Sequence, residues 1–208
     1  MPSILIESQY LPTIDFFCEL VHAEEVWIEA NESYQRQTYR NRTKIISANN
    51  IIDLIIPIKG GRKHIPIKNV EVDHEQKWLN QHVRSIVSAY GKAPFFEHYW
   101  DYFQVIFEKK HQTLFDLNWE TMTTCLTLLG ISKEVKLSNE YHKTLAHNML
   151  DLRSVYSPKN KNMPNWQYNY RQIFGNKFVK GMSIVDLLFC AGPESKQVIH
   201  NAIKTKSS

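Results

Sequence analysis

Residues 3–29 read SILIESQYLPTIDFFCELVHAEEVWIE, and this stretch decides the fold. The apolar run at 4–6 predicts a buried strand, and Pro12 marks the turn into a helix. Residues 26–28 predict a second strand. A strand, a helix and a strand in this order are typical of an α/β layer. The helix, over 13–22, has its apolar side chains on one side at helical spacing: Phe16, Phe17, Leu20 and Val21.

The rest of the chain adds strands first and helices later. Further strands are predicted at 51–58, 64–72 and 135–137, with a turn at 60–61 and a polar loop over 138–165. Helices are predicted from Asp73 to Tyr90, from Pro94 onward, from Asn118 to Gly130, and on both sides of 192–193. We expect an α/β fold in which a small mixed β-sheet, from the N-terminal third and a short later strand, packs against a predominantly helical middle and C-terminal part. One domain over residues 1–208 is the simplest organisation.

Composition excludes several classes of protein. The 208 residues are 43% hydrophobic and 22% charged, which is ordinary for a globular chain and unlike a disordered one. Three distant cysteines, Cys18, Cys125 and Cys190, exclude a disulfide framework and a cysteine-based zinc site, so we expect buried free thiols. Apolar runs are too short for a membrane span, and the N-terminus lacks the pattern of a signal peptide. The sequence therefore predicts a cytoplasmic protein.

Common catalytic and cofactor motifs are absent from the sequence. It contains neither G-x-G-x-x-G nor G-x-x-x-x-G-K-[ST], the two commonest nucleotide fingerprints, and no G-x-S-x-G elbow. Its nine histidines include no pair with H-x-x-x-H or H-E-x-x-H spacing. No metal site and no cofactor are predicted.

The formal net charge of +4 can be assigned to one segment. From Ser33 to Ile52 there is no acidic residue, and the segment carries Arg36, Arg40, Arg42 and Lys44. In an extended chain the three arginines share one face, because side chains alternate with a period of two. Guanidinium groups bind phosphate or carboxylate through paired N–H donors.

The same segment also carries Tyr34, Tyr39 and Asn41, which can bind a sugar or a base edge. It therefore favours a site for a nucleotide-sugar pyrophosphate or for an RNA backbone. The structural alternatives are a solvated strand, or arginines that pair with Asp53 or Glu71 across strands.

A second candidate site lies at residues 7–12, directly after the first strand. Ligands of open α/β sheets bind outside the carboxyl ends of the strands, and an anion can also bind at a helix N-terminus. Gln9 and Tyr10 are therefore candidates to hold a sugar or a base, and Lys92 can approach the ligand from a helix junction.

Three residues are equal candidates for a general base: Glu7, His22 and Asp186. His22 has a structural alternative, since a cation is favoured at the end of a helix. Asp186 also has one, as the third residue of a capping box that begins at Ser183.

Taken together, the motifs of the chain resemble those of the WbqC-like proteins, in the family's order and over nearly the whole sequence. Two departures are visible. Ser8–Gln9 stands where the family usually has Gln-Pro, and the chain is short between Arg153 and Tyr170, where many members carry an extra glycine-containing segment. The motifs are QYLP (9–12), DFF (15–17), Tyr34, YRNRTKI (39–45), IPI (56–58), Trp78, SIVSAYGKAPFF (85–96), Leu114, Asn118, LLGI (128–131), DLR (151–153), Tyr170, Gln172, Phe174, MSIVDLLF (182–189) and GP (192–193).

The resemblance implies a setting and no mechanism. WbqC-like proteins are associated with O-antigen and other surface-polysaccharide gene clusters, so it implies an enzyme of precursor synthesis, with acyl or aminoacyl transfer to a nucleotide-linked amino sugar. The alternative is a non-catalytic nucleic-acid- or protein-binding module that uses residues 34–44. A small phosphate-bearing sugar nucleotide is the favoured ligand, because cations are not clustered elsewhere. The oligomeric state is left open.

Overall fold

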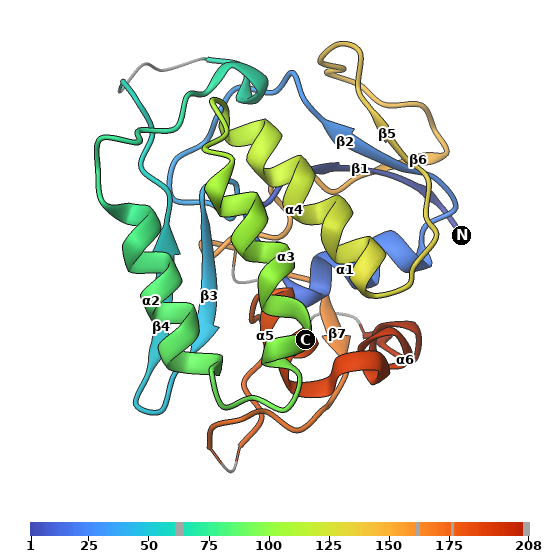
Figure 1. Cartoon of the computed structure of the whole chain (residues 1–208). Helices are drawn as coiled ribbons and strands as arrows, with labels where there is room; N and C mark the ends of the chain where they lie inside the picture. Colours follow the sequence, from blue (N-terminus) through green and yellow to red (C-terminus); the bar gives the residue numbers. More distant parts are fainter. Residues whose placement is uncertain (61–64, 161–162, 176, 206–208) are drawn as a thin grey trace.

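The computed structural model describes the chain except residues 61–64, 161–162, 176 and 206–208. Its centre is a four-stranded parallel sheet with the strand order β5-β2-β1-β6. All five residues of β1 are buried, as expected of a central parallel strand. The strands are β1 Ser3–Glu7, β2 Val26–Glu29, β5 Val135–Leu137 and β6 Met149–Asp151, and α1 Ile14–His22 joins β1 to β2. The α/β prediction is confirmed (Figure 1).

Two antiparallel strand pairs accompany this sheet. β3 (Arg42–Ile46) pairs with β4 (Ile51–Ile55), with Arg42 opposite Ile55 and Ile46 opposite Ile51. β7 (Asn165–Gln167) pairs with β8 (Ile203–Thr205), which ties the end of the chain to the body. Figure 1 shows β3 and β4 side by side, next to α2.

The middle of the chain is helical, as predicted, and its helices pack in pairs. α3 contacts both α4 and α5, and α1 contacts α5 and α6. The aromatic residues of α3 form core contacts: the rings of Phe96 and Phe103 lie 5.0 and 5.8 Å from that of Phe189. The helices are α2 Trp78–Tyr90, α3 Phe96–Glu108, α4 Leu114–Leu128, α5 Ile184–Ala191 and α6 Ser195–His200, with short 3-10 turns at Ile67–Asn69 and Gly192–Glu194.

Several predicted boundaries are wrong. Thr113, and not Asn118, caps α4, because the Thr113 hydroxyl accepts the Asp116 N–H at 3.1 Å. Asp73 lies before α2 and hydrogen-bonds Glu75 and Gln76 in a turn instead. The predicted loop over 138–165 contains β6, which pairs with the free edge of β1. The predicted strand at 64–72 is a 3-10 turn with isolated bridges. Its first residue, His64, lies outside the described residues. The second glycine of the predicted turn at 60–61 lies outside them too.

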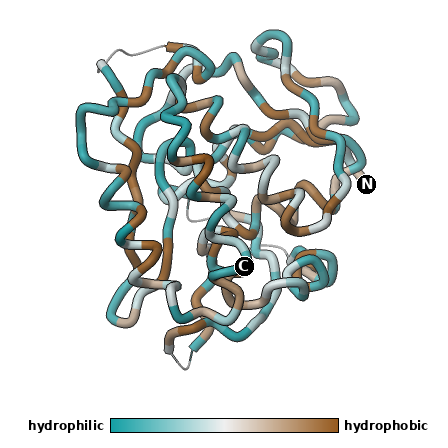
Figure 2. The backbone as a smooth tube through the Cα atoms, in the orientation of Figure 1, coloured by the Kyte–Doolittle hydropathy of each residue, from teal (hydrophilic) through white to brown (hydrophobic). Residues whose placement is uncertain are grey.

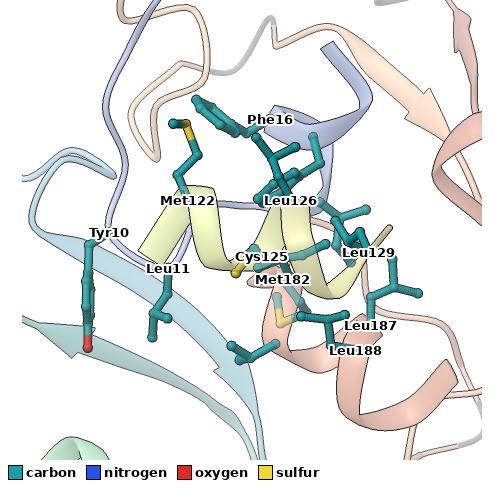
Figure 3. Packing of buried hydrophobic residues seen from close by; sticks show 14 of the residues in the cluster. Tyr10, Leu11, Phe16, Met122, Cys125, Leu126, Leu129, Met182, Leu187 and Leu188 are labelled. Carbon is teal, nitrogen blue, oxygen red and sulfur yellow. The ribbon is translucent and has the colours of Figure 1, made fainter. Parts of the chain in front are cut away.

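The core lies where α1, α4 and α5 meet. Figure 3 shows Phe16 near Met122 and Leu126, and Cys125 near Met182. All three cysteines are buried and unpaired, as predicted. Figure 2 shows hydrophobic positions gathered on the strands and inner helix faces. Within the described residues, no helix combines the length and apolar character needed to cross a bilayer.

Candidate active site at the carboxyl edge of the parallel sheet

The carboxyl ends of the parallel strands bring acidic residues together. β1 ends at Glu7, which is in register with Glu29 at the end of β2. On the other side of β1, Asp151 ends β6. The chain leaves β1 toward β2 and later returns to the opposite side, so the strand order reverses at β1. Such a switch point is where open α/β sheets bind ligands.

Glu7 is completely buried at this edge. Its Oε2 accepts the backbone N–H of Ser154 at 2.8 Å, and its Oε1 has no hydrogen-bond partner among the described residues. Burial raises the pKa of Glu7 from 4.5 to about 7, although the nearby charge of Arg40 opposes the shift. A carboxyl group with this pKa can both take and return a proton near neutral pH.

Arg40 forms a buried ion pair beside Glu7. Its Nε and Nη2 donate to the two carboxylate oxygens of Glu32 at 2.7 and 2.6 Å. Burial opposes the charge on Arg40, but the bonds to Glu32 and the charge of Glu7 raise the pKa of the guanidinium. Nη2 also donates to the Ser154 hydroxyl at 3.1 Å. Ser154 therefore contacts both the general-base candidate and its neighbouring cation.

Arg153 forms a second group of ion pairs, with the acidic residues that end β2 and β6. Arg153 donates to Glu29 at 3.0 Å and to Asp151 at 2.6 Å, and the bonds to Asp151 raise the pKa of Arg153. The Ser138 hydroxyl donates to Glu29 at 2.6 Å. Ser154, which follows Arg153 in the chain, has a left-handed φ of 63°. This backbone conformation is strained for a residue other than glycine and is typical of functional sites.

These residues were missed as site candidates. Arg153 belongs to the DLR motif, but Ser154 and Glu29 carried no signal, because their roles depend on β6 lying beside β1. Glu32 was also missed, since the expected partners of the arginines were Asp53 and Glu71.

Unsatisfied polar atoms gather around Glu7 and Arg40. Three buried atoms here have no partner in the described part of the chain: Glu7 Oε1, Arg40 Nη1 and Asn118 Oδ1. Gln9, two residues after Glu7, leaves its Nε2 unpartnered as well. Asn118 reaches across from α4, donating to the Arg40 carbonyl at 2.8 Å and to Ser8 Oγ at 3.4 Å. Native proteins rarely bury such atoms unpaired, so the cluster has capacity for a polar ligand or water.

The basic segment borders this cluster. Burial raises the pKa of Tyr34 to about 12, and the charges of Arg36, Arg42 and Arg40 oppose the shift, so all three guanidiniums act on this phenol. They do not share the face of a strand, because only Arg42 is in β3 and the chain forms turns from Arg36 to Asn41. Arg36 is exposed, and Arg42 is half-buried with its Nε unpartnered.

The model of the WbqC-like protein family matches residues 7–157 and 153–198. The chain belongs to this family. No curated protein and no solved structure matched it. The matched region begins at Glu7 and includes Arg40 and Ser154, so the carboxyl-edge site of this WbqC-like chain lies within the part that the family shares.

Three other candidate ligand residues lie inside this WbqC-like fold. The Tyr10 hydroxyl bonds to Nδ1 of buried His82 at 2.9 Å. Tyr39 is buried, and its carbonyl accepts the Tyr10 N–H at 2.9 Å. The Asn41 amide donates to the Ile56 carbonyl at 2.8 Å. These contacts hold the turn before β3 against the sheet.

The other two base candidates have different partners from those of Glu7. His22 ends α1, where its Nδ1 lies 2.9 Å from the Cys18 carbonyl and its ring lies 4.8 Å from that of Trp166. Because α1 starts at the carboxyl edge, its end lies toward the opposite edge of the sheet. Asp186 is buried in α5 and accepts a hydrogen bond from Tyr90 at 2.8 Å. Lys92 lines a cavity near Asp186.

The predicted capping box at α5 is only half formed. Ser183 caps the helix by accepting the Val185 N–H at 3.4 Å, but its own N–H donates to the Lys44 carbonyl. The Asp186 carboxylate is therefore free to bind other groups. Across the described residues there is no cluster of His, Cys, Asp and Glu suited to a metal ion.

Proposed function

We propose that this WbqC-like protein is an enzyme of surface-polysaccharide precursor synthesis, which transfers an acyl or aminoacyl group to a nucleotide-linked amino sugar at the carboxyl edge. The observation that carries the proposal is Glu7: a fully buried carboxyl with one unpartnered oxygen and a pKa raised to about 7. The family resemblance supports the polysaccharide setting.

Glu7 acts as the general base. The amine of the sugar attacks the acyl carbon and forms the new C–N bond, while the leaving group departs with the electrons of the broken bond. Glu7 Oε1 takes the proton that the amine loses. The Ser154 N–H at 2.8 Å and the charge of Arg40 stabilise the ionised form of Glu7 before the transfer. Arg40 is thus a positioning residue, because Glu32 occupies its paired donors.

Arg36 and Arg42 bind the diphosphate of the sugar nucleotide. Both act on Tyr34 electrostatically, and neither has an ion pair with a described residue. Tyr34, Gln9 and Asn118 offer polar atoms for the sugar, and Gln9 Nε2 and Asn118 Oδ1 are unpartnered among the residues described.

Titration calorimetry tests the donor site. The wild type is titrated with UDP-, dTDP-, GDP- and CMP-linked amino sugars, in parallel with Arg36→Lys, Arg42→Lys and Glu7→Gln. We expect each lysine variant to bind about tenfold more weakly, because lysine keeps the charge and loses the paired geometry. Glu7→Gln should bind within about twofold of the wild type. Failure of the wild type to bind any of these ligands would overturn the donor assignment.

Product analysis by mass spectrometry tests the transfer. The bound amino sugar is incubated with acetyl-CoA and with aminoacyl-tRNA as acyl donors. Loss of a general base lowers a rate by roughly 10²–10⁴-fold, so Glu7→Gln should form product that much more slowly while still binding the sugar nucleotide. Equal rates for both proteins would remove Glu7 from the mechanism.

A binding module remains the second candidate function, because exposed Arg36 next to half-buried Tyr34 also suits an RNA strand. The salt dependence of binding separates the two. Several phosphate contacts on a strand give a steep loss of affinity with salt, whereas one diphosphate gives a shallow loss.

A further inference from the structure

A second polar cavity lies at the far end of β3 from Glu7. Its volume is about 840 Å³, within the range of roughly 300–1,000 Å³ for ligand pockets. The junction of α2 and α3, the end of α5, and residues 169–175 and 177–178 contribute to its walls. Ile46, the last residue of β3, donates its N–H to Tyr90 on this side, whereas the Arg40 carbonyl lies at the carboxyl edge. The length of β3, roughly 13 Å by strand rise, therefore separates this cavity from the candidate active site.

The lining of the cavity is positively charged. Lys92, Arg171 and Lys177 line it, and none of its described lining residues is acidic. None of the three has an ion pair with any residue that the structure describes. Lys92 comes from the junction of α2 and α3, whereas Arg171 and Lys177 come from one later segment. Together these three cations, which have no ion pair with a described residue, form a site for an anion with more than one charge.

Aromatic rings supply an apolar surface beside these cations. Phe178 is held edge-on against Tyr170, with ring centroids 5.1 Å apart and an angle of 80°. Phe174 also lines the cavity and is half-buried, yet its ring has no aromatic partner in the described chain. The unpartnered ring of Phe174 therefore offers a face on which a planar base can stack.

Asp186 anchors this wall from inside. One of its oxygens accepts Tyr170 and Gln172, and the other accepts Tyr90 at 2.8 Å. Gln172 also bonds both the N–H and the carbonyl of Val179, at 2.8 and 2.9 Å. Two points of the chain on either side of Phe174 and Lys177 are thereby held together. The buried carboxylate thus fixes the segment that carries the cations and aromatic rings.

We propose that this cavity is a second ligand site, which binds a nucleoside diphosphate. Lys92, Arg171 and Lys177 hold the phosphates, and Phe174 stacks on the base. This site is independent of the carboxyl-edge site and does not rest on the function proposed for it.

Titration calorimetry of the full chain with UDP and ADP tests the site. We expect Arg171→Ala and Phe174→Ala each to weaken binding about tenfold or more, and Arg171→Glu to weaken it further. Arg84→Ala, which removes an exposed arginine from α2, is the matched control and should leave affinity unchanged. Pyrophosphate should bind more weakly than UDP, and uridine should not bind measurably.

Two further comparisons decide between sites and ligands. Arg36→Ala and Arg42→Ala should leave binding at this cavity intact. If they abolish binding of UDP while Arg171→Ala does not, the second site is absent and the carboxyl-edge site stands. Binding of single-stranded RNA that is tighter than UDP and falls steeply with salt would overturn the nucleotide proposal, as would no binding of UDP or ADP. Circular dichroism confirms that each variant is folded.

Discussion

The guanidinium of Arg40 and the carboxylate of Glu32 form a two-point ion pair, at 2.7 and 2.6 Å, with side chains 0% and 5% exposed. Neither charge can be solvated, so each depends on the other. The pair fixes the turn before β3 against the end of β2 and places a cation near Glu7. Its primary roles are thus structural and electrostatic.

Arg40→Met should destabilise the fold by about 3–5 kcal/mol, because it leaves the Glu32 carboxylate buried without its partner. Urea denaturation followed by circular dichroism measures this loss. Arg40→Met combined with Glu32→Leu should recover a large part of it, since no unpaired charge remains. Exposed Arg36→Met is the control and should change stability by no more than about 0.5 kcal/mol. Equal effects of the two arginine substitutions would contradict the importance of the pair.

Glu7 should make the fold less stable as pH rises. Its pKa is about 7 in the fold against an ordinary value of 4.5, so between these pH values the native state holds a proton that the unfolded state has lost. The contribution of Glu7 is most favourable below pH 4.5 and is lost as pH rises to about 7.

Replacing Glu7 by glutamine removes this titration. The stability of Glu7→Gln relative to the wild type should rise by on the order of 3 kcal/mol between pH 4.5 and 7. Denaturation curves of both proteins at half-unit pH steps measure the difference. A difference that does not change with pH would show that the pKa of Glu7 is not raised in the fold.

The sequence predicted the β1–α1–β2 unit because its evidence is local. The apolar run at 4–6 predicts the strand, and the spacing of Phe16, Phe17 and Leu20 predicts the helix. Neither prediction needs a residue that is distant in the sequence. β6 could not be predicted in this way. It has three residues in a polar stretch, and it is a strand because β1 offers it a free edge.

The candidate site was predictable only in part. Glu7 ends the apolar strand β1 and lies at the carboxyl edge of the sheet, as its place after the apolar run 4–6 indicated. The partner of Arg40 was not predictable from strand alternation, because residues 36–41 form turns that aim Arg40 inward at Glu32. Asparagine is a common helix-capping residue, but the Asn118 amide instead donates a hydrogen bond to the Arg40 carbonyl across the molecule.

His82 should make the fold acid-sensitive, opposite in sign to Glu7. Burial lowers the pKa of His82 from 6.5 to about 4. Its Nε2 faces the Ile55 carbonyl at 3.2 Å, so Nε2 carries the hydrogen and Nδ1 accepts the Tyr10 hydroxyl. A second proton on Nδ1 would reverse that bond and place a positive charge in a buried site. The unfolded state therefore gains a proton first, and stability is lost as pH falls from 6.5 to 4.

The His82→Gln variant measures this loss, because glutamine can hydrogen-bond and does not titrate. The stability advantage of the wild type over His82→Gln should shrink by on the order of 3 kcal/mol from pH 6.5 to 4. Exposed His200→Gln is the control and should show no comparable trend. A constant difference between wild type and His82→Gln would refute the burial of a neutral imidazole.

Tyr90→Phe should be costly although it removes one oxygen atom. The buried Tyr90 hydroxyl donates to Asp186 at 2.8 Å and accepts the Ile46 N–H at 3.1 Å. Its loss removes a hydrogen bond to a carboxylate and leaves the buried N–H of Ile46 without a partner, a combined effect of about 2–4 kcal/mol.

Tyr99→Phe on α3 is the matched control: the half-buried Tyr99 hydroxyl has no hydrogen bond to a described residue, so its removal should change stability by less than about 0.5 kcal/mol. Urea denaturation measures both variants. Because Tyr170 and Gln172 still hold Asp186, the Tyr90 variant should keep its affinity for UDP at the second site within about threefold once it is folded. A stability change as small as that of the control would mean that the Tyr90 hydroxyl does not link β3 to α5.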